Sequence, residues 1–122
     1  MRAETEAAHL SLIDVLSRYP QHASGLLGKV RASEIDGMYP GGTKTNPCGC
    51  IIGSLAVILG VDRWQLLGEV RQAVTGAEWP MLPIEIFIYN LRPGHTPENN
   101  ATSRQLAEWI REFIDSNPEA CR

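Results

Sequence analysis

The residues best suited to chemistry lie in one stretch, YPGGTKTNPCGC, which runs from Tyr39 to Cys50. Asn46 and Pro47 predict that a helix begins there, because Asn is a good N-cap and Pro fits the first helical position. Cys48 would then be the second residue of that helix. Free N–H groups and the helix dipole lower the pKa of a thiol in such a place, and a thiolate is a strong nucleophile.

A cysteine nucleophile needs a base, and His95 is the best candidate in the chain. Glu98 or Asn99 could orient its imidazole ring. These residues lead to one hypothesis, a cysteine-dependent hydrolase or transferase that uses Cys48 and His95. The competing interpretation is that Cys48 is a small buried apolar residue and His95 an ordinary loop residue, since their spacing matches no specific signature.

The loop PGGTKT predicts a different chemistry, the binding of an anion. Gly41 and Gly42 can turn backbone N–H groups inwards, and Lys44 adds a positive charge beside the expected helix N-terminus. The loop is not a P-loop, because the required glycine and lysine spacing is missing, and a plain turn with a solvated lysine fits the same residues. The predicted ligand site consists of Tyr39, Gly41, Gly42, Thr43, Lys44, Cys48, His95 and Thr96.

Metal binding is the third chemistry that the sequence raises. The available cysteine and histidine ligands are Cys48, Cys50, Cys121, His9, His22 and His95. Structural zinc sites normally contain two ligand pairs with short, recognisable spacing. The Cys-Gly-Cys pair has no such counterpart, so we predict no metal and no other cofactor.

The helices that must position these residues are predicted from apolar spacing and from capping residues. The first covers roughly Glu4–Arg18 and ends before Pro20. Short helices or turns are expected near Gly25–Arg31 and Ser33–Asp36, and an ordered glycine-rich loop should follow them. The helix that starts at Asn46-Pro47 should end at Gly60, which suits a left-handed C-terminal position.

Asp62 should cap the next helix, with Gln65 three residues later, and Gly76 should end it. The stretch Ile84–Leu91 fits a strand as well as a helix. Pro83 at the first position and an acidic first turn favour the helix.

The last helix should begin at Thr96-Pro97-Glu98 or at Thr102, and it should end before Pro118. Its apolar residues recur at helical spacing. The chain is therefore predicted to be an all-α single domain, residues 1–122, of about five helices.

The stretch SLAVILGVDRWQLLGEV also has the residue spacing of a helix-turn-helix motif, which predicts DNA binding as a further alternative. Its second helix would present two arginines and two glutamines. Glu69 and several apolar residues occupy much of the same helix, so two packed core helices around Gly60 is the competing interpretation. The formal net charge of −3 and the pI near 5.6 argue against nucleic-acid binding in general.

The same composition bears on location. The N-terminal residues are polar, and the longest apolar run, Cys48–Leu59, is too short to cross a bilayer, so no membrane is expected. The three cysteines have no disulfide-framework spacing. A reduced, cytoplasmic setting is therefore predicted.

Three blocks of the chain, IDGMYPGGTKTNPCGCIIGSLA, LRPGHTPENN and LAEWIREFI, resemble a set of short uncharacterised phage and bacterial proteins. Those proteins share a Cys-x-Cys block at a helix start and a Gly-x-Thr-Pro-Glu block, and the resemblance covers about two-thirds of this chain. It implies no activity and no catalytic residues. It also implies that an acidic residue is common at the position of His95, which favours a binding site over a Cys–His enzyme.

We therefore expect a non-enzymatic binding protein that recognises a small anionic ligand such as a nucleotide, or a protein partner. Lys44 would supply charge, Thr43 would orient the ligand and Tyr39 would stack on it. This site requires that Pro47 and Pro97 begin neighbouring helices. Apolar residues left outside the helical stripes suggest a self-association surface and thus a homo-oligomer; they are Trp79, Met81, Ile86 and Tyr89.

Overall fold

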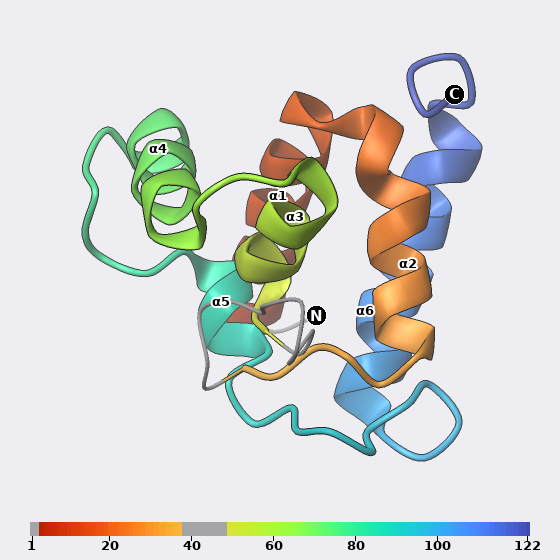
Figure 1. Cartoon of the computed structure of the whole chain (residues 1–122). Helices are drawn as coiled ribbons and strands as arrows, with labels where there is room; N and C mark the ends of the chain where they lie inside the picture. The colour runs from red at the N-terminus through yellow and green to blue at the C-terminus, as the bar shows by residue number, and fades with distance from the viewer. Residues whose placement is uncertain (1–2, 38–48) are drawn as a thin grey trace.

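The computed structural model describes residues 3–37 and 49–122, and within them the chain is helical (Figure 1). The helices are α1 (Ala3–Arg18), α2 (Ala23–Arg31), α3 (Ile51–Leu59), α4 (Arg63–Thr75), α5 (Pro83–Phe87) and α6 (Ala101–Ser116), with a 3-10 turn η1 (Pro20–His22). These two ranges contain no strand, only an isolated bridge between Ile35 and Gly49. The predicted all-α class is confirmed.

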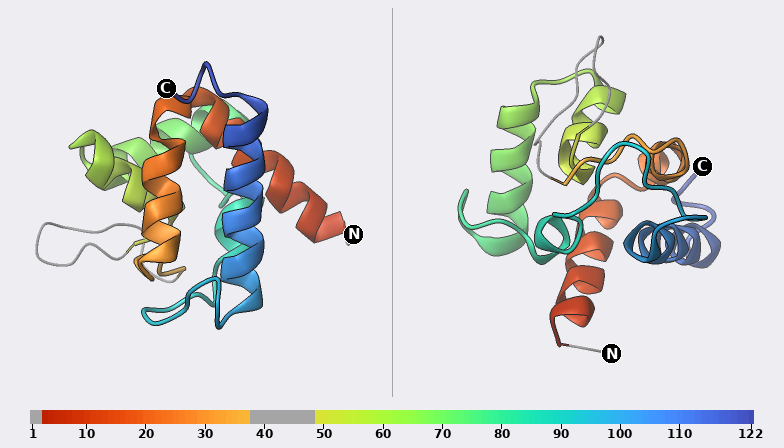
Figure 2. Two further views of the ribbon diagram at one scale, coloured as in Figure 1. Left: turned by 90° about the vertical axis from the view of Figure 1, so that its right-hand side faces the viewer. Right: turned by 90° about the horizontal axis from the view of Figure 1, so that it is seen from below.

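The helices are arranged around α1. It packs on α5 and also contacts α4 and α6. On one side α2 and α6 run next to each other in opposite directions, and on the other α3 packs against α4 (Figures 1 and 2). The N-terminal part of α1 projects from the body (Figure 2).

One apolar core joins these helices. In α1 the apolar residues at helical spacing, Leu12, Val15 and Leu16, are buried. The largest fully buried side chains come from α1, α2, α3, α5 and α6 and from the turns near α5; they are Leu12, Leu16, Leu26, Ile51, Ile52, Leu55, Leu82, Ile84, Ile88, Leu91, Leu106 and Ile110. Burying a side chain of this size stabilises a fold by about 1.5–3 kcal/mol.

Four of the predicted helix boundaries are confirmed. Gly60 and Gly76 have left-handed backbones, with φ of 71° and 84°, directly after α3 and α4. Asp62 caps α4, because its Oδ2 accepts a hydrogen bond from the Gln65 N–H at 2.9 Å. Pro83 is the first residue of α5, which confirms a helix there, although α5 ends already at Phe87.

The predicted start of the second long helix at Asn46-Pro47 is wrong. Helix α3 begins at Ile51, and Cys50 is its N-cap, with the Cys50 Sγ accepting a hydrogen bond from Gly53 N–H at 3.3 Å. The residue before it, Gly49, is paired elsewhere. Its N–H donates to the Glu34 carbonyl at 3.1 Å and its carbonyl accepts from Asp36 N–H at 2.8 Å. The bridge keeps Gly49 outside the helix, which begins only after Cys50.

The predicted starts of the last helix are also wrong. Helix α6 begins at Ala101, and the side chain of Asn100 caps it by accepting a hydrogen bond from Ser103 N–H at 2.9 Å. Pro97 lies in a turn instead, in which Asn100 N–H donates to the Thr96 carbonyl at 3.0 Å. Pro97 therefore does not begin a helix, and Pro47 lies outside the described residues.

Helix α2 contains the short helix predicted near Gly25–Arg31. The short helix or turn predicted near Ser33–Asp36 is a turn at Ser33, which leads into the bridge at Ile35. The predicted glycine-rich loop lies outside the described residues.

Helix α3 is almost entirely apolar and mostly buried. No single helix in the two described ranges is long and apolar enough to cross a membrane; α3 and α4 reach that length only together, across a bend of 118°.

Candidate binding site

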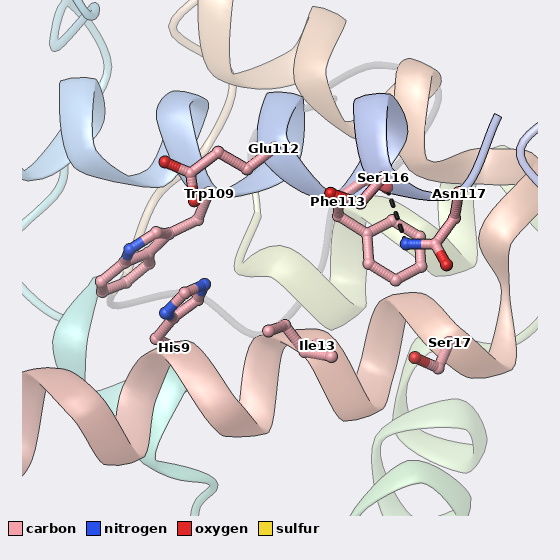
Figure 3. Close-up of a pocket in the computed structure, with 8 residues that line it drawn as sticks. All are labelled: His9, Ile13, Ser17, Trp109, Glu112, Phe113, Ser116 and Asn117. Atoms are coloured by element: carbon pink, nitrogen blue, oxygen red, sulfur yellow. Dashed lines mark hydrogen bonds between the residues drawn. The ribbon is translucent and has the colours of Figure 1, made fainter.

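A groove of about 260 Å³ between α1 and α6 holds histidine, serine and carboxylate side chains (Figure 3). Its main feature is an aromatic stack. The His9 ring lies on the Trp109 ring, with centroids 4.7 Å apart and planes 5° apart, and Phe87 packs at 4.9 Å from Trp109. These three residues come from α1, α6 and α5. The stack therefore joins three helices and explains His9 as a packing residue.

The groove does not have the geometry of a hydrolytic site. Ser17 and Ser116 lie at the far end of the groove from His9 (Figure 3). Within the described part of the chain, no hydrogen bond joins His9 to a serine or to Glu112. A serine nucleophile needs its base within hydrogen-bond reach.

A second hollow, of about 220 Å³, has a different character, and we call it the aromatic cleft. It is formed by α4, α5 and the segments that flank them, and its lining residues are Gly37, Cys50, Trp64, Leu67, Arg71, Trp79, Met81, Glu85 and Tyr89. Trp64, Trp79 and Tyr89 are 55%, 73% and 51% exposed. Two indoles and a phenol thus surround one hollow while facing solvent.

A buried ion pair forms the base of the aromatic cleft. Arg71 Nε and Nη2 donate to Glu85 Oε2 and Oε1 at 3.0 and 2.8 Å, and the two side chains are only 7% and 3% exposed. Glu85 Oε2 also accepts from Leu82 N–H at 2.7 Å. The pair therefore fixes α4 to the start of α5, and its opposite charges cancel at the base of the cleft.

The same arginine supports the rim of the cleft. The Arg71 guanidinium carbon lies 5.2 Å from the centroid of the Trp79 ring, within the range of a cation–π contact. Because Glu85 holds Arg71 by two hydrogen bonds, the exposed indole rests on a fixed support. The cleft is thus largely formed before anything binds.

Cys50 lines the cleft but is buried, which keeps its thiol protonated near neutral pH. It is 4% exposed, and burial raises the pKa of its thiol to about 11, which outweighs the hydrogen bond from Gly53 N–H. The cysteine that caps the helix is thus Cys50, and its desolvation overrides the helix N-terminus. Cys48, the cysteine of the enzyme hypothesis, lies outside the described residues.

Position 37 requires a glycine because the backbone of the turn after α5 lies directly against it. A Cβ atom at this position would lie 1.7 Å from the Ile88 carbonyl oxygen. Gly37 N–H donates to the Leu91 carbonyl at 3.0 Å. The segment before residue 38 is therefore pressed against the turn that follows α5, at one edge of the aromatic cleft.

Most of the predicted ligand site falls within residues 38–48. Tyr39, Gly41, Gly42, Thr43, Lys44 and Cys48 all lie outside the described residues. His95 and Thr96 lie in the turn before α6. His95 Nδ1 accepts a hydrogen bond from Arg92 N–H at 3.2 Å, and Thr96 N–H donates to Asn99 Oδ1 at 2.9 Å.

The turn that holds His95 contacts the same segment that pairs with Gly49. Gly94 N–H donates to Ser33 Oγ, and Arg92 lies 3.8 Å from the Asp36 carboxylate. Asn99 binds the Gly94 carbonyl and Thr96 N–H, so its side chain is occupied by the backbone and does not orient His95. Glu98 is exposed.

Helices α3 and α4 have the shape of a helix-turn-helix, since a glycine turn joins them at a bend of 118°. The charges on α4 do not fit DNA. Arg71 is neutralised by Glu85, and Asp62 and Glu69 are exposed on the would-be recognition helix. A phosphate backbone is bound by an excess of basic side chains, and among the described residues Asp62 and Glu69 outnumber the remaining arginine of this helix, Arg63.

Among residues 3–37 and 49–122 no group of three or more histidine, cysteine, aspartate or glutamate side chains could hold a metal ion. Comparison with known protein families, with curated proteins and with solved structures finds no match to this chain. The resemblance to short phage and bacterial proteins therefore stays a prediction.

The sequence indicates the aromatic cleft only in part. Trp79, Met81 and Tyr89 stand out because they fall outside the helical stripes. The role of Arg71 and Glu85 has no sequence signal, since the two residues are 14 positions apart and in different helices.

Proposed function

We propose that the protein binds a protein partner, and that the aromatic cleft receives an apolar side chain of that partner. The observation that supports this proposal is the exposure of Trp64, Trp79 and Tyr89 around one formed hollow. Tryptophan, tyrosine and arginine are the residues that dominate binding energy at protein interfaces. They do so best where the surrounding structure is already rigid, because little ordering remains to be done on binding.

The size and charge of the cleft favour a side chain as its occupant. Its volume of about 220 Å³ is below the roughly 300–1,000 Å³ of clefts that enclose drug-sized ligands. Arg71 cannot attract an anion strongly, because Glu85 neutralises it. An uncharged apolar group therefore fits better than a nucleotide.

The energy available from such a contact is large enough to matter. An aromatic side chain buries about 150–250 Å² when it is covered, and apolar burial contributes about 25 cal/mol per Å². Covering the exposed part of Trp79 and Trp64 would thus contribute several kcal/mol before the costs of association. The proposal that Lys44 and Thr43 hold a small anion is separate, because it rests on residues outside the described ranges.

The experiment is a selection of binders from a random peptide display library against the wild-type protein. We expect selected peptides to share an apolar residue and to bind Trp79→Ala at least tenfold more weakly by calorimetry. Leu10→Ala is the matched control, since Leu10 is 58% exposed on a different helix, and it should bind like the wild type. Circular dichroism must show that Trp79→Ala is folded. Equal binding of selected peptides to Trp79→Ala and to the wild type would rule the proposal out.

A further inference from the structure

A smaller hollow continues the aromatic cleft along α4. It has a volume of about 110 Å³, and its lining residues are Trp64, Leu67, Gly68, Arg71, Glu78 and Trp79, four of which also line the cleft. The two hollows therefore form one surface, with the two indoles shared between them. A partner segment that fills the first hollow can therefore reach the second.

The second hollow differs from the first because it carries a carboxylate. Glu78 is exposed and lies across α4 at Gly68, where a Cβ atom would be 3.8 Å from its Cδ and 3.9 Å from its Oε1. The glycine leaves room for the Glu78 side chain on the helix surface. In the described part of the chain Glu78 makes no hydrogen bond or ion pair.

The charges nearby do not neutralise Glu78. Arg71 lines both hollows, but its guanidinium is held by Glu85 in a two-hydrogen-bond pair. Arg63 lies 5.9 Å from the Trp64 ring centroid, whereas Asp62 and Glu69 line a different hollow, together with Tyr19 and Leu59. Of the two carboxylates among the described residues that line the two hollows, Glu85 is paired with Arg71 and Glu78 is not, so Glu78 adds a negative charge beside a base whose charges cancel.

We propose that the partner segment carries a lysine or arginine next to its apolar anchor, and that Glu78 recognises this basic residue. This inference rests on the proposed function, because the anchor in the aromatic cleft positions the segment. The aliphatic stem of a lysine or arginine can pack on the indole rings while its charged end reaches the carboxylate. An indole face near a carboxylate is a favourable place for a cation.

The test repeats the peptide selection on three proteins: the wild type, Glu78→Gln and Glu112→Gln. Glu112 is an exposed carboxylate on α6, and it serves as the control. Peptides selected on the wild type and on Glu112→Gln should carry lysine or arginine within three residues of the apolar anchor, clearly above the library frequency. Peptides selected on Glu78→Gln should keep the anchor and lose the basic residue.

Affinities then separate the two proposals. A peptide selected on the wild type should bind Glu78→Gln about two- to fivefold more weakly, as expected for an exposed ion pair, and the difference should shrink in high salt. If the basic residue is absent from wild-type peptides, or equally frequent in those selected on Glu78→Gln, this inference is wrong. Loss of binding in Trp79→Ala would then still uphold the cleft. If Trp79→Ala binds like the wild type, both proposals fail.

Discussion

At the scale of the residue, Arg71 and Glu85 set the properties of the aromatic cleft. Each satisfies the other in a place that water barely reaches, and Glu85 also accepts the Leu82 N–H. A buried pair of this kind adds little stability compared with apolar residues of similar shape, but removing one partner leaves the other charge buried and alone. Loss of either partner should therefore destabilise the fold, and the pair also supports Trp79.

Arg71→Met should therefore lower the free energy of unfolding by about 3–5 kcal/mol, measured by urea denaturation. Arg71→Met combined with Glu85→Gln should recover part of that loss, because the glutamine is uncharged and can still accept the Leu82 N–H. If the double variant is less stable than Arg71→Met alone, the unpaired charge is not the cause.

Cys50 shows how burial changes the pKa of a residue when desolvation is the largest influence on it. Its pKa is raised to about 11 in the folded chain, whereas an unfolded cysteine titrates near its usual value of about 8.5. The folded state therefore holds the thiol proton more tightly than the unfolded state does. The resulting contribution to stability is fully present below the unfolded pKa. It is lost as the pH rises towards the folded pKa.

Stability should accordingly fall between about pH 8.5 and pH 11 in the wild type, and it should fall less in Cys50→Ser, as measured by urea denaturation across this range. Native Cys50 should also resist iodoacetamide at pH 8, while the partly exposed Cys121 reacts. Peptide mass spectrometry distinguishes the labelled sites. Rapid labelling of Cys50 in the native protein would contradict its burial.

At the scale of the element, the corrected start of α6 gives a direct comparison of two neighbouring residues. Asn100 caps the helix, whereas the sequence also pointed to Thr102. Asn100→Ala should cost about 0.5–2 kcal/mol of stability, because Ser103 N–H loses its acceptor. Thr102→Ala should change stability by less than about 0.5 kcal/mol. Thermal unfolding measures both, and the reverse order would restore the original prediction.

Local signals predicted most helices well, and the failures have a common physical cause. Asp62, Gly60 and Gly76 act through neighbours within a few residues, so their roles are visible in the sequence. The start of α3 is not, because Gly49 pairs with a segment around Ile35. Those hydrogen bonds join residues that are far apart in the sequence, so no local signal predicts them.

The candidate site was predictable to a smaller degree for the same reason. Exposed Trp79 and Tyr89 could be suspected, since they fit no apolar stripe. The hollow between them depends on Arg71 meeting Glu85 and on Gly37 lying against the Ile88 carbonyl. Both are contacts between elements, and spacing along the chain does not encode them.

At the scale of the whole molecule, the main helix contacts form a closed ring, α1–α4–α3–α2–α6–α1, with α5 attached to α1 (Figure 1). Within this ring α3 is mostly buried, whereas α4 has one face towards solvent. The exposed face of α4 therefore combines the shape of a helix-turn-helix with a net acidic surface.

The net charge should decide whether the exposed face of α4 binds DNA. We expect no shift of a duplex DNA fragment at low salt, where even weak phosphate contacts are detectable, because the chain carries a formal net charge of −3. An electrophoretic assay at about 20 mM salt checks this, with a basic DNA-binding protein as the positive control. A salt-sensitive shift would revive the DNA-binding alternative.

The placement of the three tryptophans has a practical consequence. Trp109 is 2% exposed within its aromatic stack, whereas Trp64 and Trp79 stand in solvent at the cleft. The intrinsic fluorescence of the chain thus contains two separate reporters. A soluble quencher should reduce the fluorescence of Trp64 and Trp79 first, because both are exposed. The remaining fluorescence, from buried Trp109, should report unfolding. Binding at the cleft and unfolding can therefore be measured in one sample without an attached dye.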